Sequence, residues 1–347
     1  MLSIDEYKEY VREHVLDYLP EEYSNAKLEF ELALKNNDVR RETLLINNGS
    51  VIIPTIYLDQ YYKFYKDGDS IDNTLKLMSK HYLDAAKDDD INFISKDYFN
   101  FENLKDKIVP VLCNAKKNAD RLKFAPHELY SNDLAITYKI IVKDFKNDEK
   151  GVASIHINNN HMSLIGINYE TLKKTAEANF ESHYKPTFKS MHDVLKDMFI
   201  NSMSDSGMEP AIAEMMFNDE YGRLSNDSVI PMYVLSSANG YDGSVCITSQ
   251  KVMDEISEKL EGDFMIIPSS IHEVIIIPLK DNKMMDSEEI NAMINEINES
   301  CVENTDYLSD HVYKYDSEKK LVLEWNSREN YVKSMDDRNI GNRGKSI

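Results

Sequence analysis

Residues 264–278 read FMIIPSSIHEVIIIP, two aliphatic runs on either side of a short polar segment. Pro268 fixes φ and lacks a backbone N–H, so it suits the end of a strand better than the middle. The hydroxyls of Ser269 and Ser270 can bond their own backbone in a turn. The pattern predicts two buried strand segments, FMII and EVIII, with a turn or bend at Pro268, Ser269 and Ser270 between them.

The polar centre of this stretch also holds the residue types of a catalytic site. If His272 and Glu273 are neighbours on a strand, they point to opposite faces and cannot act together on one substrate atom. The GxSxG pattern of a nucleophile elbow is also missing there. We therefore interpret Ser269, Ser270 and His272 as holding a corner of the sheet. A catalytic pocket that includes His272 and Glu273 is the alternative.

Helix and strand patterns alternate along the rest of the chain. Ser3 and Glu6 form a capping-box pattern, which predicts a helix that stops before Pro20. The patterns further predict strands at 27–36, 41–49, 133–142 and 151–157, and a β block with runs at 231–237 and 244–248. They predict helices at 57–69, 71–87, 101–122 (kinked or divided at Pro110), 169–180, 188–198, 249–262 and 290–297. A hairpin is predicted at 311–325. Two segments each place a helix after a β block. They are explained by an ancient duplication or by similar patterning alone.

Composition limits the classes of partner. The chain has 347 residues, 42% of them hydrophobic, which is enough for a substantial core. Its formal net charge is 40 − 61 = −21. Phosphates are repelled on average by such a chain, so we expect no binding to duplex nucleic acid or to an anionic membrane. A protein partner is the remaining expectation.

The cysteines and the apolar runs indicate the compartment. The chain has three cysteines, Cys113, Cys246 and Cys301. Their odd number and the lack of a metal-ligand spacing favour a reducing environment. The N-terminal residues are acidic and amphipathic, unlike a signal peptide. No apolar run approaches the roughly 20 residues that span a bilayer. The prediction is a cytoplasmic protein.

Two histidines in SIHINNNHMS suggest a test for a metal site. If Asn158 and Asn159 form a two-residue hairpin turn, His156 and His161 lie opposite each other on one face. With a three-residue loop they face apart. A catalytic zinc ion needs a third ligand, for which His127 or Asp133 is a candidate by proximity in sequence alone. We favour structural histidines over a metal site.

Other polar and apolar residues have two readings each. We predict that Asp310 caps a turn rather than orienting the imidazole of His311. Met215, Met216 and Phe217 fit core packing better than a soft binding surface, because Met and Phe are often buried. The chain contains no Walker A loop, no GxGxxG and no HExxH, so no cofactor is indicated.

Six segments carry a resemblance to a known family: PTIYLDQYY, FAPHELYSNDLAITYKIIV, SIHINNNHM, MYVLSSANGYDGS, IPSSIHEVIIIP and YLSDHVYKYD. In this order they resemble family 5688 of the domains of unknown function, which comprises proteins of anaerobic gut Firmicutes. The resemblance covers roughly residues 1–325. It implies a bacterial cytoplasmic protein associated with mobile elements or phage, and it implies no activity, cofactor or catalytic residue.

These observations lead to one fold class and two functions. The fold class is α+β (irregular α/β), with a helix-rich region and short β-hairpin at 1–125, an α+β domain with a helix-covered, mostly antiparallel sheet at 126–325, and a polar, disordered tail at 326–347. Under the duplication alternative, the domain at 126–325 consists of two related β-β-α units. We favour a non-enzymatic interaction or regulatory protein. The alternative is a hydrolase or nucleotide-binding enzyme. Its candidate residues are His127, Asp133, His156, His161, His272 and Glu273.

Overall fold

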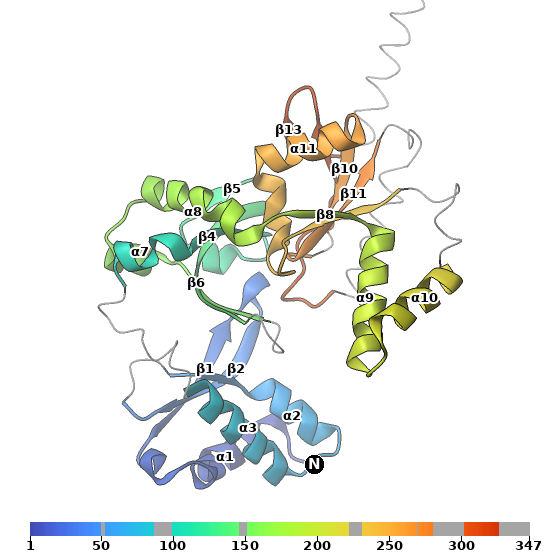
Figure 1. Ribbon diagram of the computed structural model, residues 1–347. Coiled ribbons are helices and arrows are strands. Elements are labelled where there is room, and N and C mark those ends of the chain that lie inside the picture. The colour runs from blue at the N-terminus through green and yellow to red at the C-terminus, as the bar shows by residue number, and fades with distance from the viewer. Residues whose placement is uncertain are drawn as a thin grey trace, which may run out of the picture. The chain divides into compact units, whose positions relative to one another are not determined.

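The computed structural model describes residues 1–49, 53–86, 99–145, 151–221, 231–268, 270–279 and 302–325 (Figure 1). Contacts group the chain into two compact units that alternate along the sequence. Unit 1 contains Met1–Val109, Lys117–Pro126 and Tyr138–Asn179; unit 2 contains Pro110–Lys116, His127–Thr137 and the chain from Phe180 onward. The predicted change of domain at residue 126 stays a prediction. The predicted tail and the predicted helix at 290–297 lie outside the described residues.

Unit 1 begins with helices packed on a small sheet. Ser3 and Glu6 form the predicted capping box: the Glu6 carboxylate accepts from the Ser3 N–H at 2.7 Å, and Ser3 Oγ accepts from the Glu6 N–H at 3.3 Å. The elements are α1 (Ile4–His14), the antiparallel sheet β1 (Lys27–Leu34), β2 (Arg40–Asn47) and β3 (Thr55–Tyr57), and helices α2 (Leu58–Lys66) and α3 (Ile71–Ala86). Short 3₁₀ turns lie at Val15–Tyr18, Glu21–Tyr23 and Asn36–Asp38. These elements confirm the predicted strands and helices.

The apolar faces of these elements form one core. Tyr7 and Val11 of α1, Leu44 and Ile46 of β2, Leu58 and Tyr61 of α2, and Leu75 and Met78 of α3 are all buried in it. The helical members recur at three- and four-residue steps, so each helix turns one apolar stripe inward. This periodicity explains why the sequence predicted the region well.

A second sheet contains strands that contribute residues to both units. It is formed by β4 (Ile108–Asn114), β5 (Glu128–Leu129), β6 (Leu134–Phe145) and β7 (Gly151–His156), with β6 as the strand that the others pair with. The predicted β-rich runs at 133–142 and 151–157 are confirmed as β6 and β7. Short helices α5 (Phe101–Leu104) and α6 (Ala119–Leu122), a 3₁₀ turn at Lys105–Lys107, and helices α7 (Asn159–Ile165) and α8 (Tyr169–Tyr184) accompany the sheet.

The predicted helix at 101–122 is wrong. Its centre is strand β4, in which all seven residues are buried. A continuous apolar run rich in β-branched residues fits a strand that is covered on both faces, and it carries no helical period. Pro110 in β4 has no N–H to pair, but its carbonyl accepts the hydroxyl of Tyr184 at 2.5 Å. Pairing with β6 and burial on both faces outweighed local helix propensity here.

Unit 2 is built on a six-stranded antiparallel sheet in the order β13-β12-β10-β11-β9-β8. Strands β10 (Phe264–Ile267) and β11 (Glu273–Pro278) are the two segments of FMIIPSSIHEVIIIP, with Phe264 opposite Pro278 and Ile267 opposite Ile275. The two predicted strands are confirmed, and Ser269 lies outside the described residues. The other elements are β8 (Thr187–Ser190), β9 (Tyr233–Ser236), β12 (Tyr313–Asp316), β13 (Leu321–Glu324), α9 (Met191–Asp205), α10 (Pro210–Tyr221) and α11 (Gln250–Leu260). They confirm the predicted final hairpin, the helix at 249–262 and the α+β class.

One local prediction in unit 2 is displaced and another is wrong. The helix expected at 188–198 is confirmed as α9 but begins at Met191, because Phe188 belongs to β8 and Ser190 caps α9. The β run expected at 244–248 is a buried 3₁₀ segment, Gly243–Thr248. A Cβ added at Gly243 would lie 2.3 Å from Ser237 N and 2.5 Å from His272 O, so glycine permits this close approach of the backbones.

Candidate functional site

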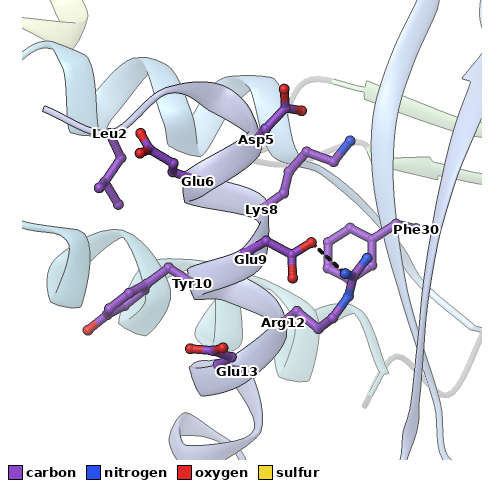
Figure 2. A pocket seen from close by; sticks show the side chains of 9 residues that line it. All are labelled: Leu2, Asp5, Glu6, Lys8, Glu9, Tyr10, Arg12, Glu13 and Phe30. Carbon is purple, nitrogen blue, oxygen red and sulfur yellow. Dashed lines mark hydrogen bonds and ion pairs between the residues drawn. The ribbon is translucent and has the colours of Figure 1, made fainter.

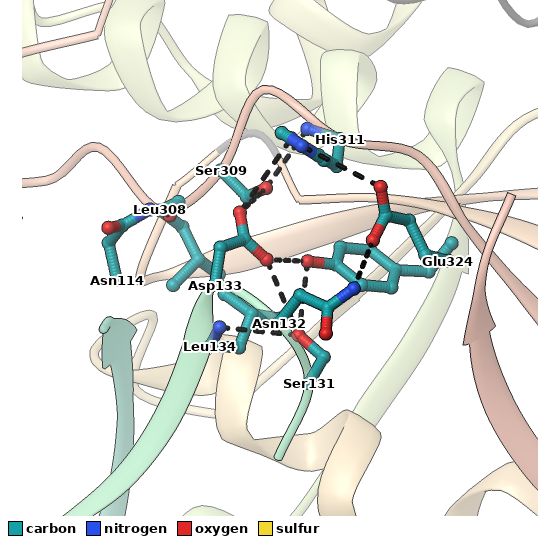
Figure 3. Close-up of polar contacts among 10 residues, drawn as sticks. Asn114, Ser131, Asn132, Asp133, Leu134, Leu308, Ser309, His311 and Glu324 are labelled. Carbon is teal, nitrogen blue, oxygen red and sulfur yellow. Dashed lines mark hydrogen bonds and ion pairs between the residues drawn. The ribbon is translucent and has the colours of Figure 1, made fainter. Parts of the chain in front are cut away.

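Asp133 is the centre of a buried polar cluster in unit 2 (Figure 3). The residue precedes β6 and is 3% exposed. Its Oδ2 accepts the hydroxyl of Ser309 at 2.5 Å, and its Oδ1 accepts the hydroxyl of Tyr313. Ser131 Oγ also donates to Oδ1, at 3.3 Å. Ser309 and Tyr313 are fully buried, so the carboxylate exchanges water for three protein hydroxyls.

Local turns position the hydroxyl groups. Ser131 Oγ accepts from the N–H of Leu134, the first residue of β6, at 3.2 Å. Ser309 Oγ accepts from the N–H of His311 at 2.9 Å. Asn114, at the end of β4, donates from Nδ2 to the Leu308 carbonyl at 2.8 Å. Each serine therefore both closes a turn and donates its proton to Asp133.

His311 lies on the solvent side of the cluster. Its Nδ1 is 3.8 Å from Asp133 Oδ2, and its Nε2 is 3.7 Å from Glu324 Oε1. The imidazole is 42% exposed, whereas the carboxylate of Asp133 is buried behind it. Asn132 Nδ2 donates to Glu324 Oε2 at 2.9 Å. The imidazole thus lies between two carboxylates, one buried and one near the surface, as Figure 3 shows.

The electrostatics keep the neighbouring tyrosines protonated. Burial raises the pKa of Tyr313, and its hydrogen bond to Asp133 raises that pKa further. Burial likewise raises the pKa of Tyr307, and a hydrogen bond to Asp310 adds to the effect. Tyr313 and Ser309 therefore act as donors to a carboxylate, and neither proton is directed at the imidazole of His311. This geometry does not match a nucleophile activated by histidine.

The sequence indicates Asp133 as a candidate but neither Ser309 nor Tyr313, and it pairs His311 with Asp310 instead of Asp133. Asp133 and Ser309 are 176 residues apart, so no spacing rule connects them. The serine and histidine of the segment YLSDHVYKYD were the available signal. The pattern of that segment predicts a turn instead, and the prediction that Asp310 caps it stays a prediction.

His272 and Glu273 lie at the corner between β10 and β11. Ser270 Oγ donates to Glu273 Oε1 at 2.8 Å and accepts from the His272 N–H at 3.0 Å. His272 Nδ1 accepts from the Asp242 N–H at 3.2 Å, and its Nε2 lies 3.7 Å from Asp306 Oδ2. These bonds join the corner to two other loops of unit 2. The role of Ser270 and His272 in holding the corner stays a prediction that these contacts support.

Burial and neighbouring carboxylates act in opposite directions on the pKa of His272. Burial lowers the pKa of this imidazole, but the carboxylates of Asp306, Asp242 and Glu273 together outweigh burial and raise the pKa above its ordinary value. A histidine between carboxylates contributes most to stability when it is charged.

Neither of the two loops considered for the segment between His156 and His161 forms, because a helix begins there. Asn158 caps α7: its Oδ1 accepts from the His161 N–H at 2.9 Å, while His161 Nδ1 lies 3.3 Å from the Asn158 N–H. His161 is thus the third residue of a helix, and His156 is the last residue of β7. Asparagine is a strong N-cap, so the asparagine run begins a helix instead of closing a two-residue turn.

His156 has a cationic neighbour. Arg121 Nη1 is 3.2 Å from His156 Nε2, and Arg121 Nη2 donates to Asn36 Oδ1 at 3.0 Å. Burial lowers the pKa of His156 to well below its ordinary value, and Lys139, Arg121 and Lys35 lower it further. A neutral imidazole beside a guanidinium accepts a hydrogen bond from it, which is a structural role.

Within the described ranges, no group of three His, Cys, Asp or Glu side chains is placed to hold a metal ion. His127 lies on an exposed loop of unit 2.

A depression of about 680 Å³ lies along α1 (Figure 2). Its walls are Leu2, side chains of α1 and Phe30 of β1. Arg12 covers the ring of Phe30 at 4.6 Å and bonds Glu9 at 2.5 Å. The lining also includes the carboxylates of Asp5, Glu6 and Glu13, and these do not converge on a common point in Figure 2. This depression supports no catalytic arrangement.

The helical hairpin α9–α10 differs from these sites because it exposes apolar side chains. Phe217 is 4% exposed, as the core-packing prediction requires, but Met215 is 68% and Met216 44% exposed, so that prediction is wrong for both methionines. Leu195 and Met198 of α9 and Ile212 of α10 are exposed as well. Helical periodicity explains the split, because Phe217 faces α9 while Met215 and Met216 lie on other sides of α10.

Comparisons with known proteins identify a family only. No curated protein and no solved structure matches the chain significantly. Among the described residues no helix has the length and apolarity needed to cross a membrane. One family model, described as a family of unknown function (DUF5688), matches residues 4–317 and confirms the resemblance seen in the sequence. Because the match extends over nearly the whole chain, the protein belongs to DUF5688.

Proposed function

We propose that this protein acts by binding another protein and catalyses no reaction itself. The observation that carries the proposal is the exposure of Leu195, Met198, Ile212, Met215 and Met216 on one small helical hairpin. Isolated exposed apolar residues are ordinary, whereas apolar residues gathered on one element mark interaction sites. Methionine suits such a surface because its unbranched side chain adapts to irregular partners.

The polar clusters support the same proposal. The hydroxyls of Ser309 and Tyr313 donate to Asp133, and Ser270 donates to Glu273. Donors directed at carboxylates inside the protein stabilise the fold and are not presented to a substrate. The net charge of −21 makes duplex nucleic acid a poor partner. We place the protein in the bacterial cytoplasm, in keeping with Cys113 and Cys246 as buried thiols.

Site-specific cross-linking tests the proposal. A photo-reactive amino acid is placed at Met215 of the full chain, in the cells that naturally produce it. We expect one adduct of defined mass, whose second component, once purified, binds the purified protein. A matched probe at Leu164, which is 66% exposed on α7, should not form this adduct. Identical adducts from both positions, or none at Met215, would contradict a specific partner.

A second candidate, a hydrolase, is favoured by the position of His311. An exposed imidazole with a buried carboxylate 3.8 Å behind it is the arrangement that orients a general base. Activity toward nitrophenyl esters and phosphates that disappears in His311→Ala, but persists in Asn132→Ala, would favour this enzyme over the binding protein. Equal background rates in the parent and both variants would count against it.

A further inference from the structure

The exposed apolar residues of α9 and α10 lie on one side of the hairpin. Packing between the helices involves His192 and Phe199 of α9 and Phe217 of α10, and the chain reverses direction between them through residues 206–209 (Figure 1). One residue corresponds to about 100° of rotation in a helix of 3.6 residues per turn. Met198 and Met216 each immediately precede one of the packed phenylalanines. In two antiparallel helices, the residue that precedes an interface residue on one helix and the residue that precedes an interface residue on the other point to the same side of the helix pair.

The remaining apolar residues follow the same rule. Ile212 immediately precedes the buried Ala213, and Met215 lies three residues after Ile212. Leu195 lies three residues before Met198 and therefore beside it on α9. These five side chains, Leu195, Met198, Ile212, Met215 and Met216, form what we name the apolar side.

An ion pair locates the opposite side of the hairpin. Lys196 Nζ is 2.7 Å from Glu214 Oε1. Glu214 immediately follows Ala213, so it is turned in the sense opposite to Ile212. The bridge between Lys196 and Glu214 therefore joins the helices on the side away from the apolar side. This contact is independent of the exposed areas and agrees with the rotational argument.

The charges on the apolar side have one sign. Asp205 is seven residues, or about two turns, after Met198, and Asp219 is four residues after Met215, so both carboxylates lie along it. Both are exposed. Lys196 is the only Lys or Arg between residues 191 and 221, and it lies on the opposite side. Within residues 191–221, which the structure describes, the apolar strip thus has carboxylates and no Lys or Arg on its side, and such a strip complements an apolar stripe flanked by basic residues.

We propose that the apolar side of α9–α10 binds a basic amphipathic helix of a partner protein. The proposal rests on the proposed binding function and adds the chemistry of the partner. An amphipathic helix places apolar residues at three- and four-residue spacing against such a surface, and its Lys or Arg residues reach the rim. Asp205 and Asp219 are the expected rim partners. A second copy of this hairpin fits poorly, because it would bring Asp205 and Asp219 against like charges.

Titration of the full chain with a synthetic peptide tests this inference. The peptide has about 18 residues, long enough to form a helix on binding, with Leu at helical spacing and Lys at all other positions. One control peptide has Glu in place of Lys, and a second has the Leu and Lys residues scrambled. We expect calorimetry to show saturable binding of the first peptide alone, and binding that weakens with added salt. Equal binding of the scrambled or the acidic peptide would overturn the inference.

Variants of the hairpin locate the binding. Leu195→Gln and Met215→Gln should each weaken the peptide about five- to tenfold. Asp205→Asn combined with Asp219→Asn should weaken it and reduce its salt dependence. The matched controls Leu164→Gln and Glu258→Gln change exposed residues of α7 and α11 and should leave affinity unchanged. Equal loss in hairpin and control variants would mean binding to the general acidic surface and would overturn the inference.

Two further results separate this inference from the proposed function. A defined cross-linked partner at Met215, together with no binding of the basic peptide, would leave the binding function standing and remove the basic helix as its ligand. Concentration-dependent self-association in sedimentation, abolished by Met215→Gln, would show that a second copy occupies the apolar side and would also overturn the inference.

Discussion

The Asp133 cluster places polar groups in the interior of the protein, and the α9–α10 hairpin places apolar side chains on its surface, and both placements cost free energy. The cluster buries a carboxylate, and three hydroxyls compensate for its lost water. The hairpin exposes five apolar side chains, and its carboxylates point to a basic partner. A buried polar residue with hydrogen-bond partners inside the protein is explained by its contribution to stability. A surface on which apolar side chains gather is explained by a binding partner. For this reason we assign structure to the first region and propose function for the second.

Asp133→Ala should have the largest effect on stability. The substitution leaves Ser309 and Tyr313 buried without their acceptor, and each unsatisfied hydroxyl should lower the free energy of unfolding by about 1–3 kcal/mol. Urea unfolding followed by circular dichroism measures the change. Asn132→Ala, at the exposed neighbour, should cost about 0.5 kcal/mol or less. Equal losses of unfolding free energy in Asp133→Ala and Asn132→Ala would show that the buried cluster does not stabilise the fold more than its exposed neighbour does.

Tyr313→Phe removes one donor and keeps the ring. A hydrogen bond to a charged group contributes about 1.5–3 kcal/mol, and the unfolding free energy should fall by that amount. Tyr10→Phe is the matched control, because the Tyr10 hydroxyl makes no hydrogen bond to the described residues. If Tyr313→Phe unfolds at the parent's urea concentration, Asp133 must be satisfied without this tyrosine.

Ser190→Ala tests how firmly the hairpin is attached to the sheet. Ser190 Oγ accepts from the Asp193 N–H at 3.1 Å as the cap of α9. Loss of an N-cap costs about 1 kcal/mol. Hydrogen exchange should accelerate in the first turn of α9 and remain slow in β10. Ser202→Ala, an exposed position within the same helix, should not accelerate exchange, and similar behaviour of the two variants would argue against the cap.

A pH series compares two histidines whose shifts have opposite signs. The pKa of His272 is raised above 6.5, so its contribution is complete below pH 6.5 and is lost as pH rises through the folded value. The pKa of His156 is well below 6.5, so stability is lost as pH falls below 6.5 and the unfolded chain takes up the proton. Unfolding free energies of the parent, His272→Gln and His156→Gln between about pH 5 and 8 measure both effects.

The two variants should change the pH profile in opposite directions. His272→Gln should remove part of the parent's decline on the alkaline side, and His156→Gln part of its decline on the acidic side. Parallel profiles for all three proteins would show that neither imidazole is coupled to its charged neighbours.

Met215→Gln should have the smallest effect on stability. The side chain is largely exposed, so the unfolding free energy should change by about 0.5 kcal/mol or less. Binding of the basic peptide should nevertheless weaken in the same variant. A large loss of stability would mean that Met215 is covered in solution by another part of the chain, and the comparison with the Asp133 cluster would then fail.

Local pattern alone determined several elements of this protein. The β10–β11 pair followed from two aliphatic runs around Pro268, and α1 followed from the Ser3–Glu6 capping box. The final hairpin, β12–β13, followed from alternation around a turn. In these cases the residues that decide the structure are close neighbours in the chain, so their spacing carries the information.

Other features depended on tertiary contacts. The pattern around strand β4 predicts a helix, because a short apolar run fits either structure until its pairing partner is known. Asp133 meets Ser309 only after the chain has folded, since 176 residues separate them. The exposure of Met215 depends on which side of α10 packs against α9, and a methionine in a sequence fits a core equally well. The sequence therefore determined the elements that have local signals. The Asp133 cluster and the exposed side of α9–α10 were determined by burial and long-range pairing, because these depend on which residues pack nearby in the folded chain.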